Sequence, residues 1–145
     1  MPDCSSDLTL ALDLDRLIRW LDCSMRPRLI EADHLRIGPF GAMVLACIAD
    51  HEPIALQSLS QRLDRDKSQI TRTVQKLERK TLVSKERSTD DGRVWLVSLT
   101  GDGRRLARTF QANLAEIVDE LFGQLEESDR QQFAKILAQV VSTQP

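Results

Sequence analysis

Four polar residues between positions 67 and 80 recur every three or four residues: Ser68, Arg72, Gln75 and Arg79. An α-helix turns by about 100° per residue, so in a helix these four share one side. Arginine pairs with guanine, glutamine pairs with adenine, and serine bonds to a base edge or a phosphate. This side of the helix therefore suits contact with duplex DNA. Lys67, Gln69, Thr71 and Lys76 lie beside it and complete the predicted surface.

The opposite side of the same segment is apolar. Ile70, Val74 and Leu77 fall there at helical spacing, which predicts a buried face and an amphipathic helix over residues 67–80. Asp66 is a suitable N-cap for this helix, and Gln69 stands three residues later, where a capping box would place it. Glu78 lies away from the polar side, so that side has no acidic residue near its centre.

Two strand-like runs follow the helix, over residues 82–87 and 93–99. Trp95, Val97 and Leu99 alternate along the second run, as on a half-buried strand, and the Asp-Gly pair at positions 91–92 predicts a tight hairpin turn. Two arginines flank this turn, Arg87 and Arg93. An arginine there can enter the minor groove, and we expect the Asp91 carboxylate to hold the Arg93 guanidinium in place.

The rest of the chain predicts helices that would position these groups. A helix over residues 56–63 precedes the polar helix across a short turn, which gives a helix-turn-helix with a β-wing. Further helices are expected over residues 10–25, interrupted by Pro27, over 40–50, from a Thr100 cap to 122, and from a capping box at Ser128 and Gln131 onward. The predicted fold class is mainly α with a small β-wing.

Charge is unevenly distributed along the chain. The net charge is −2, but residues 60–108 hold 13 Lys and Arg against 7 Asp and Glu. The segments on either side, 1–59 and 109–145, are each acidic by four charges. The basic charge therefore lies in the segment predicted to meet phosphates, a distribution typical of nucleic-acid binding.

The residues DKSQITRTVQKLERKTL at 66–82, then Asp91-Gly-Arg93, then Leu99-Thr-x-x-Gly103, resemble the MarR/SlyA family of winged helix-turn-helix transcriptional regulators. The resemblance extends to the flanking helices. It implies a homodimer that binds a pseudo-palindromic DNA duplex, usually as a repressor. It also implies one domain over 1–145, with dimerisation helices in 1–36 and 104–145 and a DNA-binding lobe in 37–103.

The resemblance places particular residues on DNA. Ser68, Gln69, Thr71, Arg72 and Lys76 match the family's recognition helix, Arg93 its wing arginine and Asp91 the supporting aspartate. Two positions depart from the family pattern. Thr81 stands where glycine often ends the recognition helix, so either the helix ends differently or Thr81 has an ordinary conformation. Pro27 interrupts a first helix that is often longer.

The family also tends to bind small aromatic or anionic ligands. The residues that could line such a pocket are Trp20, Phe40, Met43 and Cys47, although apolar residues at this spacing also suit a plain core. The cysteines Cys4, Cys23 and Cys47 are widely spaced and read as free thiols. The peroxide-sensing branch adds tyrosines, which this chain lacks. A zinc site at Glu31, Asp33 and His34 has few ligands, so we expect no metal and no cofactor.

Other function classes are disfavoured. No nucleophile–base pair or phosphate loop is present, so an enzyme is not expected. No apolar run reaches the roughly 18 residues of a spanning helix, and the N-terminal segment lacks the early positive charge of a signal peptide. We therefore expect a cytoplasmic protein without a membrane partner. The alternatives to a DNA-binding regulator are a winged-helix protein-interaction module and a thiol-based redox regulator.

Overall fold

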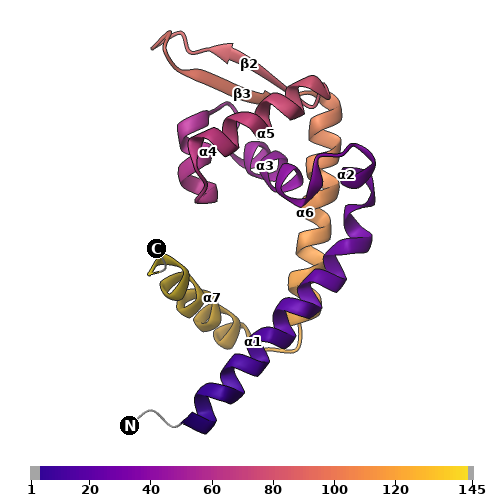
Figure 1. The fold of residues 1–145 in the computed structure, drawn as a ribbon, viewed down its shortest axis with the longest axis vertical. Helices are drawn as coiled ribbons and strands as arrows, with labels where there is room; N and C mark the ends of the chain where they lie inside the picture. Colours follow the sequence, from indigo (N-terminus) through magenta and orange to yellow (C-terminus); the bar gives the residue numbers. More distant parts are fainter. Residues whose placement is uncertain (1–3, 144–145) are drawn as a thin grey trace. The chain divides into compact units, whose positions relative to one another are not determined.

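The computed structural model describes residues 4–143, which are mainly helical with one small antiparallel sheet (Figure 1). The elements in chain order are α1 (Cys4–Met25), the 3₁₀ helix η1 (Arg26–Leu29), α2 (Ile30–His34), α3 (Gly38–His51), β1 (Ile54–Ala55), α4 (Leu56–Leu63), α5 (Lys67–Arg79), β2 (Val83–Arg87), β3 (Trp95–Leu99), α6 (Gly101–Phe122) and α7 (Glu127–Ser142). The chain forms two compact units, Met1–Asn113 and Leu114–Pro145. The fold class predicted from the sequence is confirmed.

The first helix ends where the sequence predicted. Pro27 lies in the first turn of η1, directly after α1 ends at Met25. Proline lacks the backbone N–H that an α-helix needs and clashes with the preceding turn, so the chain tightens into a 3₁₀ turn. It then resumes α-helical form as α2.

The core of the first unit lies around α3. This helix buries Val44, Leu45 and Ile48 completely, because apolar residues occupy nearly all of its sides. Met43 is an exception, with 39% of its surface exposed. Leu59 of α4 and the three apolar residues of α5, Ile70, Val74 and Leu77, complete this core. The predicted buried face of residues 67–80 is therefore confirmed.

The sheet contains one strand that sequence analysis missed. Its order is β1-β3-β2, so β3 pairs on both sides. Ile54 lies opposite Val97 in the β1–β3 pair, and Lys85 lies opposite the same Val97 in the β2–β3 pair. The two-residue β1 is too short to show a period-2 pattern, which explains why it was not predicted. Figure 1 shows β2 and β3 extending together as a hairpin from the helices.

Three helices end on a left-handed residue that is not glycine. Arg36, Asp64 and Thr81 have φ values of 56°, 49° and 57°. At the end of α5, the Leu82 N–H donates to the Leu77 carbonyl at 3.0 Å and the Thr81 N–H donates to the Glu78 carbonyl at 2.9 Å. This pair of bonds is the Schellman motif, which normally has glycine at the left-handed position. The α5 helix therefore ends in the usual way, and the alternative of an ordinary Thr81 conformation is wrong.

The start of α6 is tied to the end of α5. The Thr100 hydroxyl accepts from the Gly103 N–H at 3.1 Å, which confirms the predicted cap, and donates to the Thr81 carbonyl at 2.6 Å. A Cβ at Gly103 would lie 1.8 Å from the Leu82 carbonyl oxygen. The threonine and the glycine of the Leu-Thr-x-x-Gly motif are thus needed for a cap and for a close backbone approach.

Two predicted capping boxes do not form. Asp66 is the N-cap of α5 but its side chain makes no capping bond. The last helix starts after Glu126, two residues before the predicted Ser128 cap, and Gln131 bonds instead to the Glu127 carboxylate at 2.9 Å. Sequence spacing fixes only which residues are near each other, whereas a cap also requires a particular backbone and rotamer.

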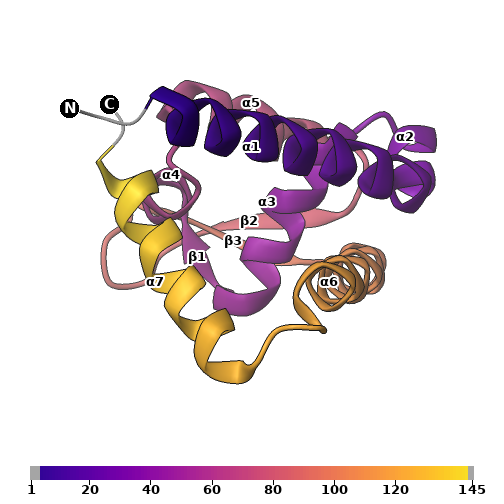
Figure 2. The same cartoon turned by 90° about the horizontal axis from the view of Figure 1, so that it is seen from below.

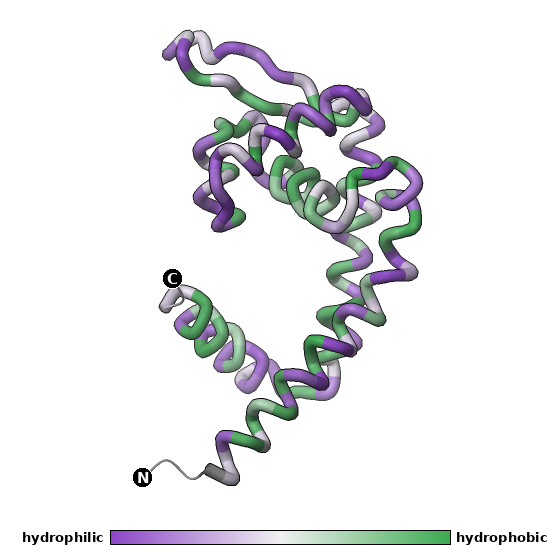
Figure 3. Tube along the Cα trace, in the orientation of Figure 1, coloured by the Kyte–Doolittle hydropathy of each residue, from purple (hydrophilic) through white to green (hydrophobic). Residues whose placement is uncertain are grey.

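Large apolar residues are exposed on two helices. In α1 these are Leu8, Leu10, Leu12, Leu14 and Ile18, and in α7 they are Phe133, Ile136, Leu137, Val140 and Val141. Figure 3 shows hydrophobic and hydrophilic residues alternating along both helices. In the second unit, α6 joins α7 through a short connection (Figure 2), and the Phe122 and Phe133 rings lie 5.1 Å apart.

No single helix among residues 4–143 is long and apolar enough to cross a membrane. One strongly bent pair, Ser5–His34 with Gly38–His51, meets the criteria of length and composition only. The second helix of this pair is α3, whose apolar side chains form the core described above.

Candidate nucleic-acid interface

The helix α5 presents the polar side that its sequence predicted. Its buried face is Ile70, Val74 and Leu77, and the residues of the opposite side, Ser68, Arg72, Gln75 and Arg79, are all exposed. Lys67 and Lys76 are exposed as well, while Gln69 and Thr71 are half-buried. The structure therefore brings these eight residues together on one helix, next to the sheet.

Few of these side chains are occupied by contacts within the chain. The Thr71 hydroxyl donates to the Lys67 carbonyl at 2.8 Å, and Arg79 Nε donates to the Gln75 carbonyl at 3.4 Å. Neither Arg72 nor Lys76 has an ion-pair partner among residues 4–143. The one acidic residue of the helix, Glu78, pairs with Lys85 of β2 at 3.0 Å. The polar side of α5 thus keeps its cations available for an anionic partner.

The wing tip carries Arg93, which is exposed and has no ion-pair partner in the described part of the chain. Asp91 does not hold its guanidinium, as the sequence led us to expect. The Asp91 carboxylate instead accepts from the backbone N–H of Arg93 at 3.0 Å. The aspartate therefore shapes the loop and leaves the arginine side chain free.

The loop between the strands is close to the predicted one, but the Asp-Gly pair does not form a tight turn of its own. The Ser88 N–H donates to the Val94 carbonyl at 2.9 Å and the Val94 N–H donates to the Asp91 carbonyl at 2.9 Å, so the loop spans residues 89–93. Gly92 does not have a positive φ. The Asp-Gly pair therefore lies in an ordinary turn within a longer loop.

Arg87 lies in a different environment from Arg93. Its guanidinium carbon is 4.5 Å from the centroid of the Trp95 ring, and its Nη1 donates to the Gly92 carbonyl. Both predicted wing arginines are exposed, but only Arg93 has no contact within the wing that would compete with DNA.

A hollow of about 450 Å³ separates the wing from the helices α4 and α5. Arg93 and Trp95 line it from the wing, and Lys67 lines it from α5. Gln57, Ser58 and Gln61 of α4 line the facing wall, and sequence analysis did not select them. The signal was present as polar residues at helical spacing before the turn, but it does not differ from an ordinary solvated helix.

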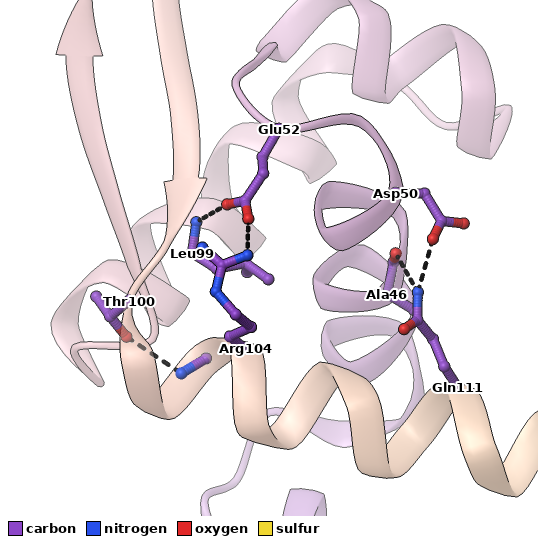
Figure 4. Close-up of polar contacts among 8 residues, drawn as sticks. Ala46, Asp50, Glu52, Leu99, Thr100, Arg104 and Gln111 are labelled. Carbon is purple, nitrogen blue, oxygen red and sulfur yellow. Dashed lines mark hydrogen bonds and ion pairs between the residues drawn. The ribbon is translucent and has the colours of Figure 1, made fainter.

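A half-buried carboxylate supports the base of the wing. Glu52, which follows α3, accepts from the Leu99 N–H at 2.7 Å through one oxygen and pairs with Arg104 of α6 through the other (Figure 4). Gln111 of α6 donates to the Ala46 carbonyl and to Asp50 of α3 in the same view. One carboxylate thus joins the end of β3 to α3 and α6.

Of the residues expected to line a ligand pocket, Phe40, Met43 and Cys47 lie on α3 and Trp20 lies on α1. None of the four lines the hollow beside the wing, the hollow along residues 5–13 of α1 or the hollow near Pro39. Phe40 instead lies 5.7 Å from the Arg65 guanidinium, and Met43 is exposed. The last of these hollows, of about 320 Å³, lies among Leu21, Asp22, Met25, Arg26, Leu29, Asp33 and Pro39.

The cysteine thiols and the candidate metal ligands add little chemistry to this surface. Burial raises the pKa of the Cys47 thiol, which disfavours the reactive thiolate. Cys23 is exposed, and the side chain of Cys4 lies outside the described part of the structure. Within residues 4–143 no cluster of three His, Cys, Asp or Glu side chains is placed to hold a metal.

A helix-turn-helix, a hairpin wing and unpaired cations on both elements define a winged helix-turn-helix protein. The MarR family model matches residues 42–95, which run from α3 to the start of β3. The winged helix-turn-helix of this chain is therefore similar to that of MarR-type DNA-binding transcriptional regulators.

Two relatives come from Bacillus subtilis strain 168. An uncharacterised HTH-type transcriptional regulator, YdgJ, is 25% identical over 97 residues, or 67% of this chain. The match spans 59% of the length of YdgJ. The HTH-type transcriptional repressor MdtR is 25% identical over 132 residues, which are 90% of this chain and 85% of MdtR.

Solved structures share the fold. A complex of S. aureus MepR with DNA has a TM-score of 0.72 at 21% identity and covers 90% of this chain and 97% of its own. The transcriptional regulator SlyA has a TM-score of 0.75 at 14% identity and covers 92% of both chains. PcaV of Streptomyces coelicolor, in complex with its natural ligand, has a TM-score of 0.64 at 21% identity, over 81% of this chain and 89% of PcaV.

Proposed function

We propose that this chain is a sequence-specific regulator that binds duplex DNA as a homodimer and acts as a repressor in the cytoplasm. The observation that carries the proposal is that two exposed cationic elements, α5 and the wing, lie in the same lobe. The α5 side of Ser68, Arg72, Gln75 and Arg79 would lie in the major groove, and Arg93 would enter the adjacent minor groove. The known structure of MepR with DNA supports this arrangement.

The flanking helices supply the proposed dimer. The exposed apolar residues of α1 and α7 form helical surfaces that a second copy of the chain would cover. A dimer would place two α5 helices about 34 Å apart, one turn of DNA, and the operator would be pseudo-palindromic. The parts proposed for these roles are residues 1–36 and 104–145 for dimerisation and 37–103 for DNA binding.

A small-molecule effector is part of the proposal, supported by the ligand complex of PcaV. The hollow of about 320 Å³ has an apolar floor of Leu21, Met25 and Leu29. Of its charged groups, Arg26 already pairs with Asp22 at 2.7 Å. The remaining Asp33 would repel an anion, so this hollow suits a neutral or cationic ligand better than the aromatic anions that the family resemblance implied.

The alternative functions have less support. A protein-interaction module without DNA binding would not need unpaired cations along α5 and at the wing tip. A thiol-based regulator would need a reactive cysteine, and burial raises the pKa of Cys47. The repressor MdtR, with 85% of its length matched, favours regulation through DNA over both alternatives.

The test is selection of bound duplexes from a random pool, followed by affinity measurements with single variants. Arg72→Ala should weaken binding to the selected duplex by about 1–3 kcal/mol and relax its preference at one position in each half-site. Arg93→Ala should weaken binding to every duplex alike and reduce its salt dependence. Fluorescence anisotropy measures both effects. Equal binding of all duplexes by the wild-type chain, or none at low salt, would contradict the proposal.

A further inference from the structure

Three side chains on one face of the wing form a cluster, which we call the wing cluster: Lys85, Arg87 and Trp95. Arg87 and Trp95 lie directly opposite each other in the β2–β3 pair. The Arg87 guanidinium carbon is 4.5 Å and the Lys85 Nζ is 5.8 Å from the Trp95 ring centroid. Two cations within about 6 Å of one indole ring is a cation–π arrangement.

This face of the wing is the outward continuation of the core. Val83, Val97 and Leu99 lie on the same face of the hairpin and are buried, because side chains alternate along a strand. Beyond them the hairpin leaves the helices, and Trp95 remains 39% exposed. The wing cluster therefore takes the place of a hydrophobic core at the part of the hairpin that no helix covers.

Arg87 also holds the loop that carries the free arginine. Its Nη1 donates to the Gly92 carbonyl, next to Arg93. The loop is closed at its base by the Ser88–Val94 backbone bond and shaped by Asp91, which accepts from the Arg93 N–H. Moving the Arg87 side chain to a phosphate would break both its ring contact and its carbonyl contact.

The other end of the wing cluster is attached to the recognition helix. Lys85 pairs at 3.0 Å with Glu78 of α5, and its side chain is only 22% exposed. A chain of contacts thus runs from Glu78 through Lys85, Trp95 and Arg87 to the wing loop. It connects the two elements that the proposed function places in adjacent grooves.

We propose that Arg87 and Trp95 are positioning residues that set where Arg93 lies relative to α5, and that Arg87 does not bind a DNA phosphate. The inference depends on the proposed function, because it concerns the geometry of a DNA-reading surface. It also replaces the sequence-based expectation that both wing arginines contact DNA. Trp95 suits this role because it lines the same hollow as Lys67 of α5 and Arg93 of the wing.

The first experiment measures affinity for the selected duplex by fluorescence anisotropy over a series of KCl concentrations. Arg93→Ala should lower the steepness of log K against log salt by about 0.9 per lobe, as expected for the loss of one cation that neutralises phosphate charge from within the minor groove. Arg87→Ala should weaken binding about tenfold at each salt concentration, with the steepness unchanged. A drop in steepness with Arg87→Ala as large as that with Arg93→Ala would overturn the inference while leaving the proposed function intact.

A double-mutant cycle tests whether Arg87 acts through Trp95. Trp95→Leu should weaken DNA binding as Arg87→Ala does, and the double variant should bind no worse than the weaker single variant. Additive losses would overturn the inference. If the wild-type chain bound no duplex at all, the proposed function would fail and this inference with it, so the two failures are distinguishable.

A measurement without DNA tests the contact itself. In a Trp20→Phe background, Trp95 is the only tryptophan of the chain. Arg87→Ala should then increase acrylamide quenching of Trp95 fluorescence and shorten its anisotropy decay, whereas Arg93→Ala, the matched arginine control, should change neither. Unchanged Trp95 fluorescence with Arg87→Ala would overturn the inference. Circular dichroism of each variant confirms that the helices are retained.

Discussion

The helices α3 to α5 with the sheet differ from α1 and α7 in where they place their apolar residues. In the first group, Leu45, Ile48 and Leu77 are fully buried within a single chain. In α1 and α7 residues of the same kind, such as Ile18 and Leu137, remain about half exposed or more. One region buries its apolar residues within a single chain, and the other keeps exposed the apolar residues that would be covered in the dimer we propose.

This difference indicates that the residues that stabilise the fold of one chain are distinct from those that would form the proposed dimer. The winged-helix region is held in place by residues of the same chain, including Arg104 of α6, which pairs with Glu52 at the base of the wing. The terminal helices carry apolar surface that is costly in water, at about 25 cal/mol per Å². We therefore expect the stability losses caused by mutations in the two regions to depend differently on protein concentration. The following predictions use that difference.

The largest effect should come from placing charge on the exposed apolar face of α7. In the double variant Ile136→Asp and Val140→Asp, two carboxylates would be buried if a second copy covered this face, so the dimer should dissociate. Loss of the linked second lobe should weaken DNA binding by about 100-fold or more. Sedimentation equilibrium gives the mass, and Lys135→Asp, on the opposite side of α7 and with the same change in net charge, is the control. A variant that remained dimeric would place the partner surface elsewhere.

A smaller effect should follow from emptying the winged-helix core. Leu77→Ala removes a fully buried side chain and should lower the free energy of unfolding by about 3 kcal/mol. The loss should be the same at every protein concentration. Leu137→Ala is the matched variant in α7, and its loss should depend on concentration, because dimerisation and folding are linked there. Urea unfolding at several protein concentrations measures both losses. The same concentration dependence in the two variants would contradict the difference between the two regions.

The smallest predicted effect is a gain in stability. Thr81 is a β-branched residue at φ 57°, which costs about 1 kcal/mol relative to a residue without a Cβ. Thr81→Gly should therefore raise the free energy of unfolding by about 0.5–1 kcal/mol, independently of concentration. Lys80→Gly, one residue earlier at φ −86°, has no such strain to relieve and should lower it. A loss of stability in Thr81→Gly would show that the hydrogen bond from the Thr81 hydroxyl to the Lys80 carbonyl, at 2.7 Å, outweighs the backbone strain.

The sequence predicted those elements whose signal is periodic. Ile70, Val74 and Leu77 defined the buried face of α5 because three side chains at helical spacing allow one interpretation. It did not predict features that depend on one rotamer, which is why Asp66 is the N-cap but the Asp66–Gln69 capping box does not form, and why Asp91 bonds to the Arg93 N–H and not to its guanidinium. Arg87 shows the same limit within the site. Its residue type and its position in the wing suggested a DNA contact, and only the structure reveals that its side chain lies over Trp95 and bonds to Gly92.

The central position of β3 has a consequence for how the wing can vary in length. Because β1 and β2 both pair with β3, a residue inserted in β3 would turn Val97 or Leu99 out of the core, since side chains alternate. An insertion in residues 89–93 meets no such constraint. Related chains should therefore change the reach of the wing through the length of this loop, while the strand that anchors it keeps its length.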